Sequence, residues 1–232
     1  MLVETWMSKP VITVDAADSM QTAIKRLKEH HIRMLPVMEG ENLVGVVSDR
    51  DLKRASASNA NTLEGHELVY LLSKINIKEI MTLNPITVQP EYTLEETARI
   101  LLENKISGVP VVDDQDAVIG IITRDDLLKV LVNLTGVDKR GIQFALQVVD
   151  RPQSVSAIVD VVEKFGGRMV SLLTSCEKAP KGYRNVYIRA YQINRQNLSS
   201  LLNELKESAM LLHMVDHRND TSEINTYYNL SS

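Results

Sequence analysis

The sequence predicts an α/β (α+β) protein: a duplicated unit of strands and helices, followed by a smaller module with its own order of elements. The first observation is an internal repeat, because "GVVSDRDL" at residues 45–52 returns as "GIITRDDL" at residues 120–127. The second is that both copies alternate short β-branched runs with helical periodicity, as α/β folds do. The third is a change of pattern after residue 141, where a strand, helix, strand, strand, helix, strand series begins.

In the first copy, the elements come in the order strand, helix, strand, strand, helix. The expected strands are residues 11–14, 34–38 and 43–48, and the first helix starts at Ser19, a typical N-cap residue. The apolar positions of that helix recur at helical spacing, at Met20, Ala23, Ile24 and Leu27. We therefore expect a first domain over residues 1–74.

The second copy repeats this order over residues 75–136. The expected strands are residues 86–88, 108–112 and 117–123, and the first helix starts at Thr93. Between the copies, the sequence predicts a Ser/Ala/Asn-rich loop that begins at residue 55, and then a helix over residues 63–75. We expect the two units to pack against each other, because their apolar faces are then buried in a shared core.

Composition and charge limit the class of protein. The 232 residues are 44% hydrophobic, which is enough to bury sizeable cores, and the net charge of −4 with scattered basic residues disfavours a nucleic-acid partner. We expect no membrane partner, because no apolar run reaches the roughly 20 residues that span a bilayer and the N-terminus lacks a secretory pattern. The single cysteine, Cys176, fits a reducing compartment, so we expect a cytoplasmic protein.

A hydroxyl and a carboxylate recur together after an apolar run in both copies: Ser48 with Asp51, and Thr123 with Asp126. One interpretation is helix capping, in which the hydroxyl accepts from free amides and the acidic residue completes a capping box. The other is ligand binding, because a strand-to-helix junction attracts an anion and a carboxylate accepts hydrogen bonds from ribose hydroxyls. The residues alone leave both interpretations open.

Residues 1 to about 134 resemble a tandem pair of CBS domains, a Bateman module, through "RMLPVM…LVGVVSDRDL" and "SGVPVVDD…VIGIITRDDL". The resemblance implies a regulatory module without catalytic residues. Such a module binds an adenosine nucleotide (AMP, ADP or ATP), or a related adenosyl compound such as S-adenosylmethionine, in two clefts. This ligand is an effector, and no catalytic cofactor is expected.

The resemblance also implies which residues contact the ligand. Asp51 and Asp126 would hold ribose hydroxyls, and backbone near residues 11–12 and 85–86 would contact adenine. The full expected set is Val11, Ile12, Arg33, Met34, Pro36, Ser48, Arg50, Asp51, Pro85, Ile86, Ser107, Gly108, Pro110, Thr123 and Asp126.

The two copies differ where the ligand's phosphate is expected. The first carries Arg33 and Arg50, whereas the second has Ser107 and Asp125 at the matching positions. We therefore expect the first cleft to be the better phosphate site. The second would take a less charged adenosine compound or stay empty.

Residues 141–218 resemble an ACT domain, a ferredoxin-like small-molecule sensor, through "VVDRPQSVSAIVDVVEKFGGRMVSL". That family has glycine after its Asp-x-Pro, where this chain has Asp150, Pro152 and then Gln153. The departure favours dimerisation over amino-acid binding. The polar tail, residues 219–232, is expected to fray.

The whole order resembles the acetoin-utilisation protein AcuB family. We expect a non-enzymatic regulator that binds an adenine nucleotide, forms a homodimer and acts on an unidentified protein. No metal-ligand spacing or catalytic constellation is found in the sequence. The alternatives are an amino-acid sensor that uses the ACT-like domain, and an accessory protein or enzyme of acetoin-type carbon metabolism.

Overall fold

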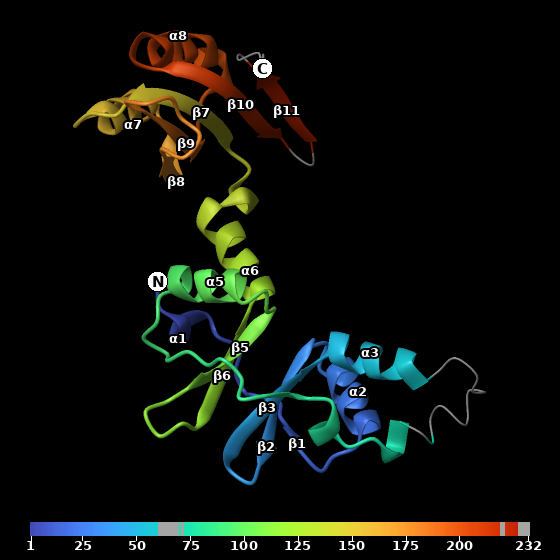
Figure 1. The fold of residues 1–232 in the computed structure, drawn as a ribbon. Helices are drawn as coiled ribbons and strands as arrows, with labels where there is room; N and C mark the ends of the chain where they lie inside the picture. The colour runs from blue at the N-terminus through green and yellow to red at the C-terminus, as the bar shows by residue number, and fades with distance from the viewer. Residues whose placement is uncertain (60–69, 71, 219–220, 227–232) are drawn as a thin grey trace. The chain divides into compact units, whose positions relative to one another are not determined.

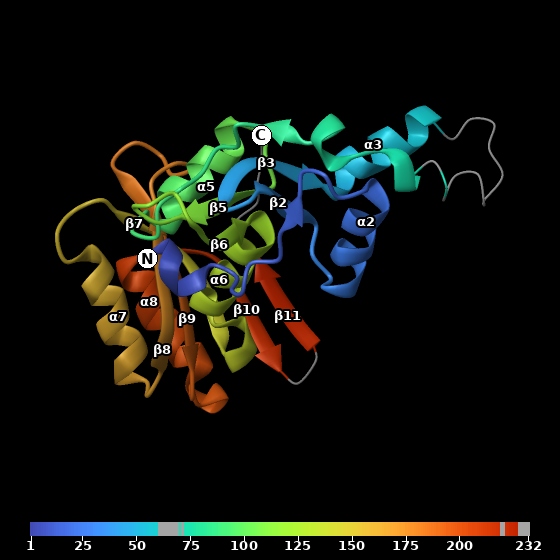
Figure 2. The same cartoon turned by 90° about the horizontal axis from the view of Figure 1, so that it is seen from below.

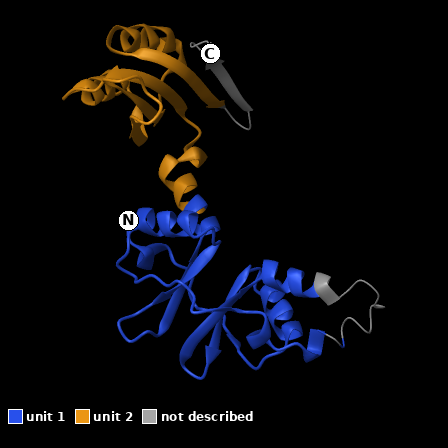
Figure 3. Ribbon diagram, in the orientation of Figure 1, with its two compact units in different colours: residues 1–128 blue, residues 129–232 orange. Residues whose placement is uncertain are grey.

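The computed structural model describes residues 1–59, 70, 72–218 and 221–226. The chain divides into two compact units, residues 1–128 and residues 129–232 (Figure 3). The helix predicted over residues 63–75 lies largely outside the described residues. Within the part of the chain that is described, no helix combines the length and apolar character needed to span a bilayer.

Residues 1–128 fold as two similar α/β repeats. Their elements are α1 (Val3–Trp6), β1 (Val14–Asp15), α2 (Met20–Glu29), β2 (Met34–Glu39), β3 (Asn42–Ser48), α3 (Asp49–Asn59), the 3₁₀ turn η1 (Ile77–Glu79), β4 (Thr82–Leu83), α5 (Leu94–Glu103), β5 (Gly108–Val112), β6 (Val118–Thr123) and the start of α6 (Arg124–Thr135). One sheet has the order β1-β2-β3-β4, and β5 pairs with β6 in a second sheet.

The helices begin where the sequence predicts, because hydroxyl side chains cap them. Ser19 Oγ accepts from the Thr22 amide at 3.2 Å at the start of α2. Thr93 and Glu96 form a reciprocal capping box at the start of α5, with the Thr93 amide donating to Glu96 Oε2 at 3.0 Å. These hydrogen bonds satisfy amides that have no partner inside the helix.

Each repeat is completed by a segment that precedes the other repeat in sequence. The N-terminal segment lies on the second repeat, where the Val3 amide donates to Tyr92 O at 2.9 Å and the Ser8 amide to Ile121 O at 2.8 Å. In the same way, β4 pairs with β3, and Ile77 is buried in the core of the first repeat. Each repeat therefore packs with a segment from the other side of the predicted division between residues 74 and 75.

The repeated glycines make this exchange of segments possible. A Cβ added at Gly45 would lie 2.7 Å from Met81 Sδ and 2.9 Å from the Thr82 carbonyl oxygen. A Cβ added at Gly120, the equivalent position, would meet the side chain of Met7. Glycine is thus required at both places because another part of the chain approaches the strand closely.

Two details of the first unit differ from the sequence-based expectation. The strands expected at residues 11–14 and 86–88 are reduced to β1 and to a bridge between Val88 and Val111, because only those residues find a neighbouring strand. The loop expected from residue 55 is still helical up to the end of α3 at Asn59. There Ser56 Oγ donates to Leu52 O at 2.9 Å within the helix.

Residues 129–232 contain a third sheet, with helices. After the end of α6 come the 3₁₀ turn η2 (Val137–Lys139), β7 (Ile142–Val149), α7 (Ser154–Lys164), β8 (Arg168–Ser175), β9 (Tyr183–Tyr191), the 3₁₀ turn η3 (Arg195–Asn197), α8 (Leu198–Ser208), β10 (Met210–Arg218) and β11 (Thr221–Thr226). The sheet order is β11-β10-β7-β9-β8, all antiparallel. The strand, helix, strand, strand, helix, strand order is the ferredoxin-like one that the sequence predicts.

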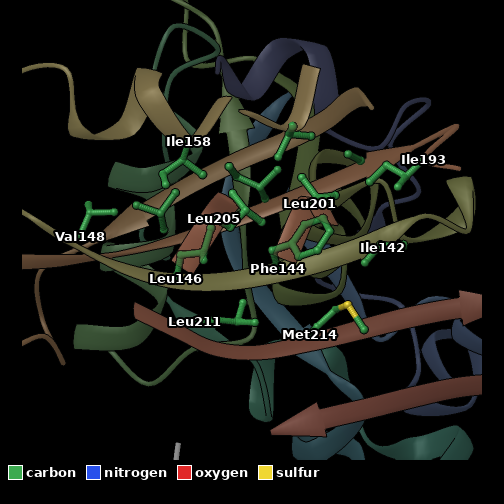
Figure 4. Packing of buried hydrophobic residues seen from close by; sticks show 14 residues of the cluster. Ile142, Phe144, Leu146, Val148, Ile158, Ile193, Leu201, Leu205, Leu211 and Met214 are labelled. Carbon is green, nitrogen blue, oxygen red and sulfur yellow. The ribbon is translucent and has the colours of Figure 1, made fainter. Parts of the chain in front are cut away.

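Alternation along the strands builds the core of this unit on one face of the sheet. Phe144 and Leu146 on β7 point to the same side and pack with Ile158 of α7 and Leu201 of α8 (Figure 4). All four side chains are fully buried. Because successive strand residues face opposite sides, Gln143 and its neighbours lie on the other face.

The C-terminal part differs from the expected polar tail. β10 and β11 lie side by side and antiparallel, with His213 opposite Thr226 and Arg218 opposite Thr221 (Figures 1 and 2). The stretch "TSEINT" is rich in β-branched residues, and β10 would otherwise be an edge strand with unpaired backbone groups. Part of the predicted tail is therefore a strand.

Candidate functional site

A cavity of about 590 Å³ lies between the two repeats of the first unit. Five segments enclose it: the start of β2, the end of β3 with the start of α3, β4 with the residues after it, the segment that leads into β5, and the start of α6. Ten of the predicted ligand-binding residues line it: Arg33, Met34, Ser48, Arg50, Asp51, Pro85, Ile86, Ser107, Gly108 and Pro110. The structure thus brings residues from both repeats into one place.

The other five predicted residues do not line this cavity. Val11 lines a separate cavity of about 760 Å³ with Asp15 and Asp18, while Pro36 is buried within β2. Ile12 packs against the core of the first repeat. Thr123 and Asp126 lie at the matching junction of the second repeat, between β6 and α6.

Ser48 and Asp51 form a closed hydrogen-bonded pair at the start of α3. Ser48 Oγ donates to Asp51 Oδ2 at 2.6 Å, and the Ser48 amide donates to the same oxygen at 3.0 Å. The Asp51 amide donates back to Ser48 Oγ at 3.3 Å. The capping interpretation of this motif is therefore correct.

The cap engages only one oxygen of the Asp51 carboxylate. Oδ1 lies 3.4 Å from Arg54 Nη2, and Arg54 is itself 77% exposed. A carboxylate oxygen has room for further donors, so Oδ1 can accept from a hydroxyl group in the cavity. Capping and ligand binding are compatible functions of the same side chain.

The second repeat carries the same pair in the same geometry. Thr123 Oγ1 donates to Asp126 Oδ2 at 2.6 Å, the Thr123 amide at 3.0 Å, and the Asp126 amide lies 3.3 Å from Thr123 Oγ1. Asp126 is 7% exposed. The two copies thus share their local structure, and the first of them lines the cavity of about 590 Å³.

The cavity lining is rich in positive charge. Arg33, Arg50, Lys105 and Arg124 line it together with the carboxylates of Asp49 and Asp51. Arg124 is fixed by a hydrogen bond from Nη2 to Leu101 O at 3.1 Å. Such a set of cations suits an anionic group such as a phosphate.

Lys105 is a lining residue that the sequence analysis did not single out. It sits two residues before Ser107 and has a left-handed backbone, with φ of 55°. His31, the equivalent residue of the first repeat, has φ of 53°. The repeat alignment therefore contains the signal that could have identified Lys105, because both residues occupy the same turn before a strand.

The loop between β7 and α7, where the ACT resemblance is centred, borders a cavity of about 350 Å³. Gln153 there has φ of 68°, the conformation in which the family's glycine is favourable. Asp150 is engaged by Arg184, whose Nε and Nη2 lie 2.8 and 2.7 Å from Oδ1. Among the described residues no cluster of His, Cys, Asp and Glu could hold a metal ion.

Comparisons with known proteins identify the family of the first unit. The CBS domain family model matches residues 3–58 and 77–133. A CBS domain-containing protein of Dictyostelium discoideum is 31% identical over 134 residues, which cover 57% of this chain and 92% of that protein. An inosine-5'-monophosphate dehydrogenase of Korarchaeum cryptofilum is 37% identical over 124 residues, or 53% of this chain and 23% of the enzyme.

Among solved structures, the CBS domain pair of protein MJ0100, in complex with 5'-methylthioadenosine and S-adenosyl-L-methionine, is 36% identical. The match covers 56% of this chain and 95% of that chain, with a TM-score of 0.49. The two stretches matched by the family model are the two predicted repeats, so the predicted tandem pair is confirmed. The ACT resemblance of residues 141–218 stays a prediction.

Proposed function

Because the chain belongs to the CBS domain family, we propose that it is a regulatory protein whose CBS pair binds an adenosine nucleotide or a related adenosyl compound. The site is the cavity beside Asp51. One observation carries the proposal: the Ser48–Asp51 pair, the segment at Pro85 and Ile86, and a group of cations all line the same cavity. We propose no catalytic function for the chain.

Each part of the cavity matches one part of such a ligand. Asp51 Oδ1 accepts from the ribose hydroxyls, while Oδ2 remains in the cap with Ser48. Backbone and apolar atoms at Pro85 and Ile86 form a wall for the adenine ring. The volume of about 590 Å³ is within the range of roughly 300–1,000 Å³ that is common for small-molecule sites.

The charges favour a ligand that carries phosphate. Arg50 and Arg124 come from different repeats and line the same cavity, so a phosphate would neutralise cations from both. Beside Asp126, the second repeat carries Asp125 where the first repeat carries Arg50 beside Asp51. We therefore infer that the cleft beside Asp51 is the phosphate site, and that the region beside Asp126 binds a less charged adenosine compound or none.

We further infer that the second unit mediates dimerisation. β8 is the edge strand of its sheet, and Leu172 and Leu173 on it are 39% and 43% exposed. An apolar edge strand with unpaired backbone groups is suited to pairing with a second copy. Ligand binding would regulate such an assembly if the ligand prefers one of two arrangements of the chain. Sedimentation of Leu172→Lys tests this inference, because a charged edge should give the monomer.

The experiment that tests the binding site uses the internal duplication as its control. Asp51→Asn and Asp126→Asn alter equivalent cap carboxylates, so each variant changes the same hydrogen bonds to a neighbouring hydroxyl and amide. Only Asp51 lines the cavity. Melting temperature and calorimetric affinity are measured for both variants with AMP, ADP, ATP and S-adenosylmethionine.

We expect at least one adenosyl compound to raise the melting temperature of the wild-type chain. Asp51→Asn should weaken its binding at least about tenfold, because the ribose contact is lost, while Asp126→Asn should keep it within about twofold. Equal affinity in the wild type and Asp51→Asn would contradict the site. The absence of any response to all four compounds would contradict the function.

A further inference from the structure

Arg189 on β9 is a buried cation that the nucleotide site does not use. Its residue exposure is 6%, and Nη2 donates to Gln143 Oε1 at 3.1 Å across to β7. Nη1 is buried without a hydrogen-bond partner, and no described residue forms an ion pair with this side chain. Burial lowers the pKa of Arg189. A buried charge without a counter-charge is unfavourable in a folded protein. Arg189 is therefore a candidate for binding an anionic group.

Arg189 lines a cavity of about 340 Å³ within the second unit. Its neighbours on β9, Ile188 and Ala190, belong to the hydrophobic core, so Arg189 and Tyr187 lie on the opposite face of the sheet. The last turns of α6 contribute Leu131 and Val132 to the same cavity. The cavity is therefore formed between a helix and the sheet face that α7 and α8 do not cover.

The lining of this cavity is apolar with one positive charge. Leu131 is 53% exposed and Leu173 is 43% exposed, although both are large apolar side chains. Among the described lining residues, Arg189 is the one with a charge, and Gln143, Tyr187 and Ser171 add polar groups. An occupant that covers the apolar walls and neutralises Arg189 would remove both unfavourable features at once.

We propose that this cavity binds a small organic carboxylate with an apolar body. The carboxylate pairs with the guanidinium group of Arg189, and the apolar body covers Leu131, Val132 and Leu173. A planar guanidinium matches a carboxylate, and the volume is close to the lower end of about 300–1,000 Å³ for small-molecule sites. The proposal concerns the second unit alone and does not depend on nucleotide binding to the first.

The apolar walls select against a simple inorganic anion. Phosphate or chloride would satisfy the charge and leave Leu131 and Leu173 exposed, so it would gain nothing from the hydrophobic effect. A carboxylate with a ring or a branched chain gains from both interactions. Phenylacetate is a suitable probe, with phenylacetamide as its uncharged counterpart and acetate as the carboxylate without an apolar body.

The test measures binding of these three compounds to the full chain by calorimetry and by thermal shift. We expect phenylacetate to bind, with phenylacetamide and acetate at least about tenfold weaker, since each lacks one of the two interactions. Arg189→Gln should weaken phenylacetate binding about 10- to 100-fold. Arg184→Gln, on the same strand but paired with Asp150, is the matched control and should bind phenylacetate as the wild type does.

The effect of Arg189→Gln can also be measured on the free protein, through its melting temperature. The substitution removes a buried charge and keeps a polar group that can reach Gln143, so the melting temperature of the free protein should rise. A rise together with lost phenylacetate binding supports the proposal. Equal binding of phenylacetate and phenylacetamide, unchanged binding in Arg189→Gln, or no binding of phenylacetate would each overturn it.

Discussion

Arg33 Nη1 lies 3.6 Å from Asp125 Oδ2, so an arginine of the first repeat is paired with an acidic residue of the second. Both side chains are exposed, at 80% and 55%, and the pair therefore adds little to stability. Its position matters more, because Arg33 lines the cavity beside Asp51. In the proposed complex, Asp125 would compete with a phosphate for the same guanidinium group.

Asp125→Asn should therefore strengthen the binding of a phosphorylated ligand. We expect AMP affinity to rise about two- to fivefold, because Arg33 loses a competing partner at the price of less than about 1 kcal/mol in stability. Calorimetry with AMP and adenosine separates an effect on phosphate binding from an effect on the rest of the site, because adenosine has no phosphate and its affinity should not change. Arg33→Gln should act in the opposite direction on AMP alone. Equal changes for AMP and adenosine would refute the assignment of Arg33 to the phosphate.

The two repeated glycines should tolerate alanine differently. At Gly45 the new Cβ would lie 2.9 Å from the carbonyl oxygen of Thr82, which is backbone and cannot rotate away. At Gly120 the nearest atoms belong to Met7, whose side chain is flexible. We expect Gly45→Ala to destabilise by about 1–3 kcal/mol and Gly120→Ala by less, measured as urea midpoints at constant m-value. The reverse order would show that the Met7 contact is the more rigid of the two.

Arg195 should be important for the stability of the second unit. Its Nε and Nη2 lie 2.9 and 2.7 Å from the two oxygens of Asp216, which is 1% exposed. Arg195→Met would leave that buried carboxylate without its arginine, and we expect a loss of about 2–4 kcal/mol. Arg184→Met removes a more exposed pair with Asp150 and should cost less than about 1 kcal/mol. Thermal unfolding of both variants distinguishes them, and equal losses would contradict the role assigned to burial.

His217 should make stability depend on pH. Burial and the nearby charge of Arg189 lower its pKa below the ordinary 6.5, while Asp216 acts in the opposite direction. Below pH 6.5 the unfolded chain binds a proton that the folded chain binds less readily, so stability falls as the pH decreases. We expect His217→Gln to reduce this fall between about pH 7 and pH 5. Melting curves of His213→Gln, on the same strand, are the control, and parallel curves for wild type and His217→Gln would disprove the linkage.

The local parts of this fold were predictable because their causes are local. Ser19 and Thr93 cap helices, and the hydroxyl–carboxylate motif at Ser48 could be identified as a cap, because each acts on amides a few residues away. The element order of both units follows from periodicity for the same reason. Ten of the residues expected to contact the ligand line one cavity, because the repeat and its family resemblance place them at equivalent positions.

The remaining features depend on contacts between distant segments. Nothing near Gly120 in sequence indicates that Met7 packs on it, and nothing near β10 indicates that residues 221–226 add a further strand. Arg189 lies in a strand whose alternation is otherwise ordinary, and its isolation becomes visible only when its neighbours are known. Local periodicity does not indicate which distant segment pairs with the edge strand of a sheet. It also does not indicate whether a charged side chain finds a partner of opposite charge.

The exchange of segments between the repeats limits the order in which this protein can fold during synthesis on a ribosome. The sheet of the first repeat is complete only when β4, which ends at Leu83, has been made. The N-terminal segment, made first, pairs with residues 90–93 and with β6, so its last partner is made more than a hundred residues later. The first repeat therefore emerges with one open sheet edge and one unpaired end, and the two repeats reach their native state together.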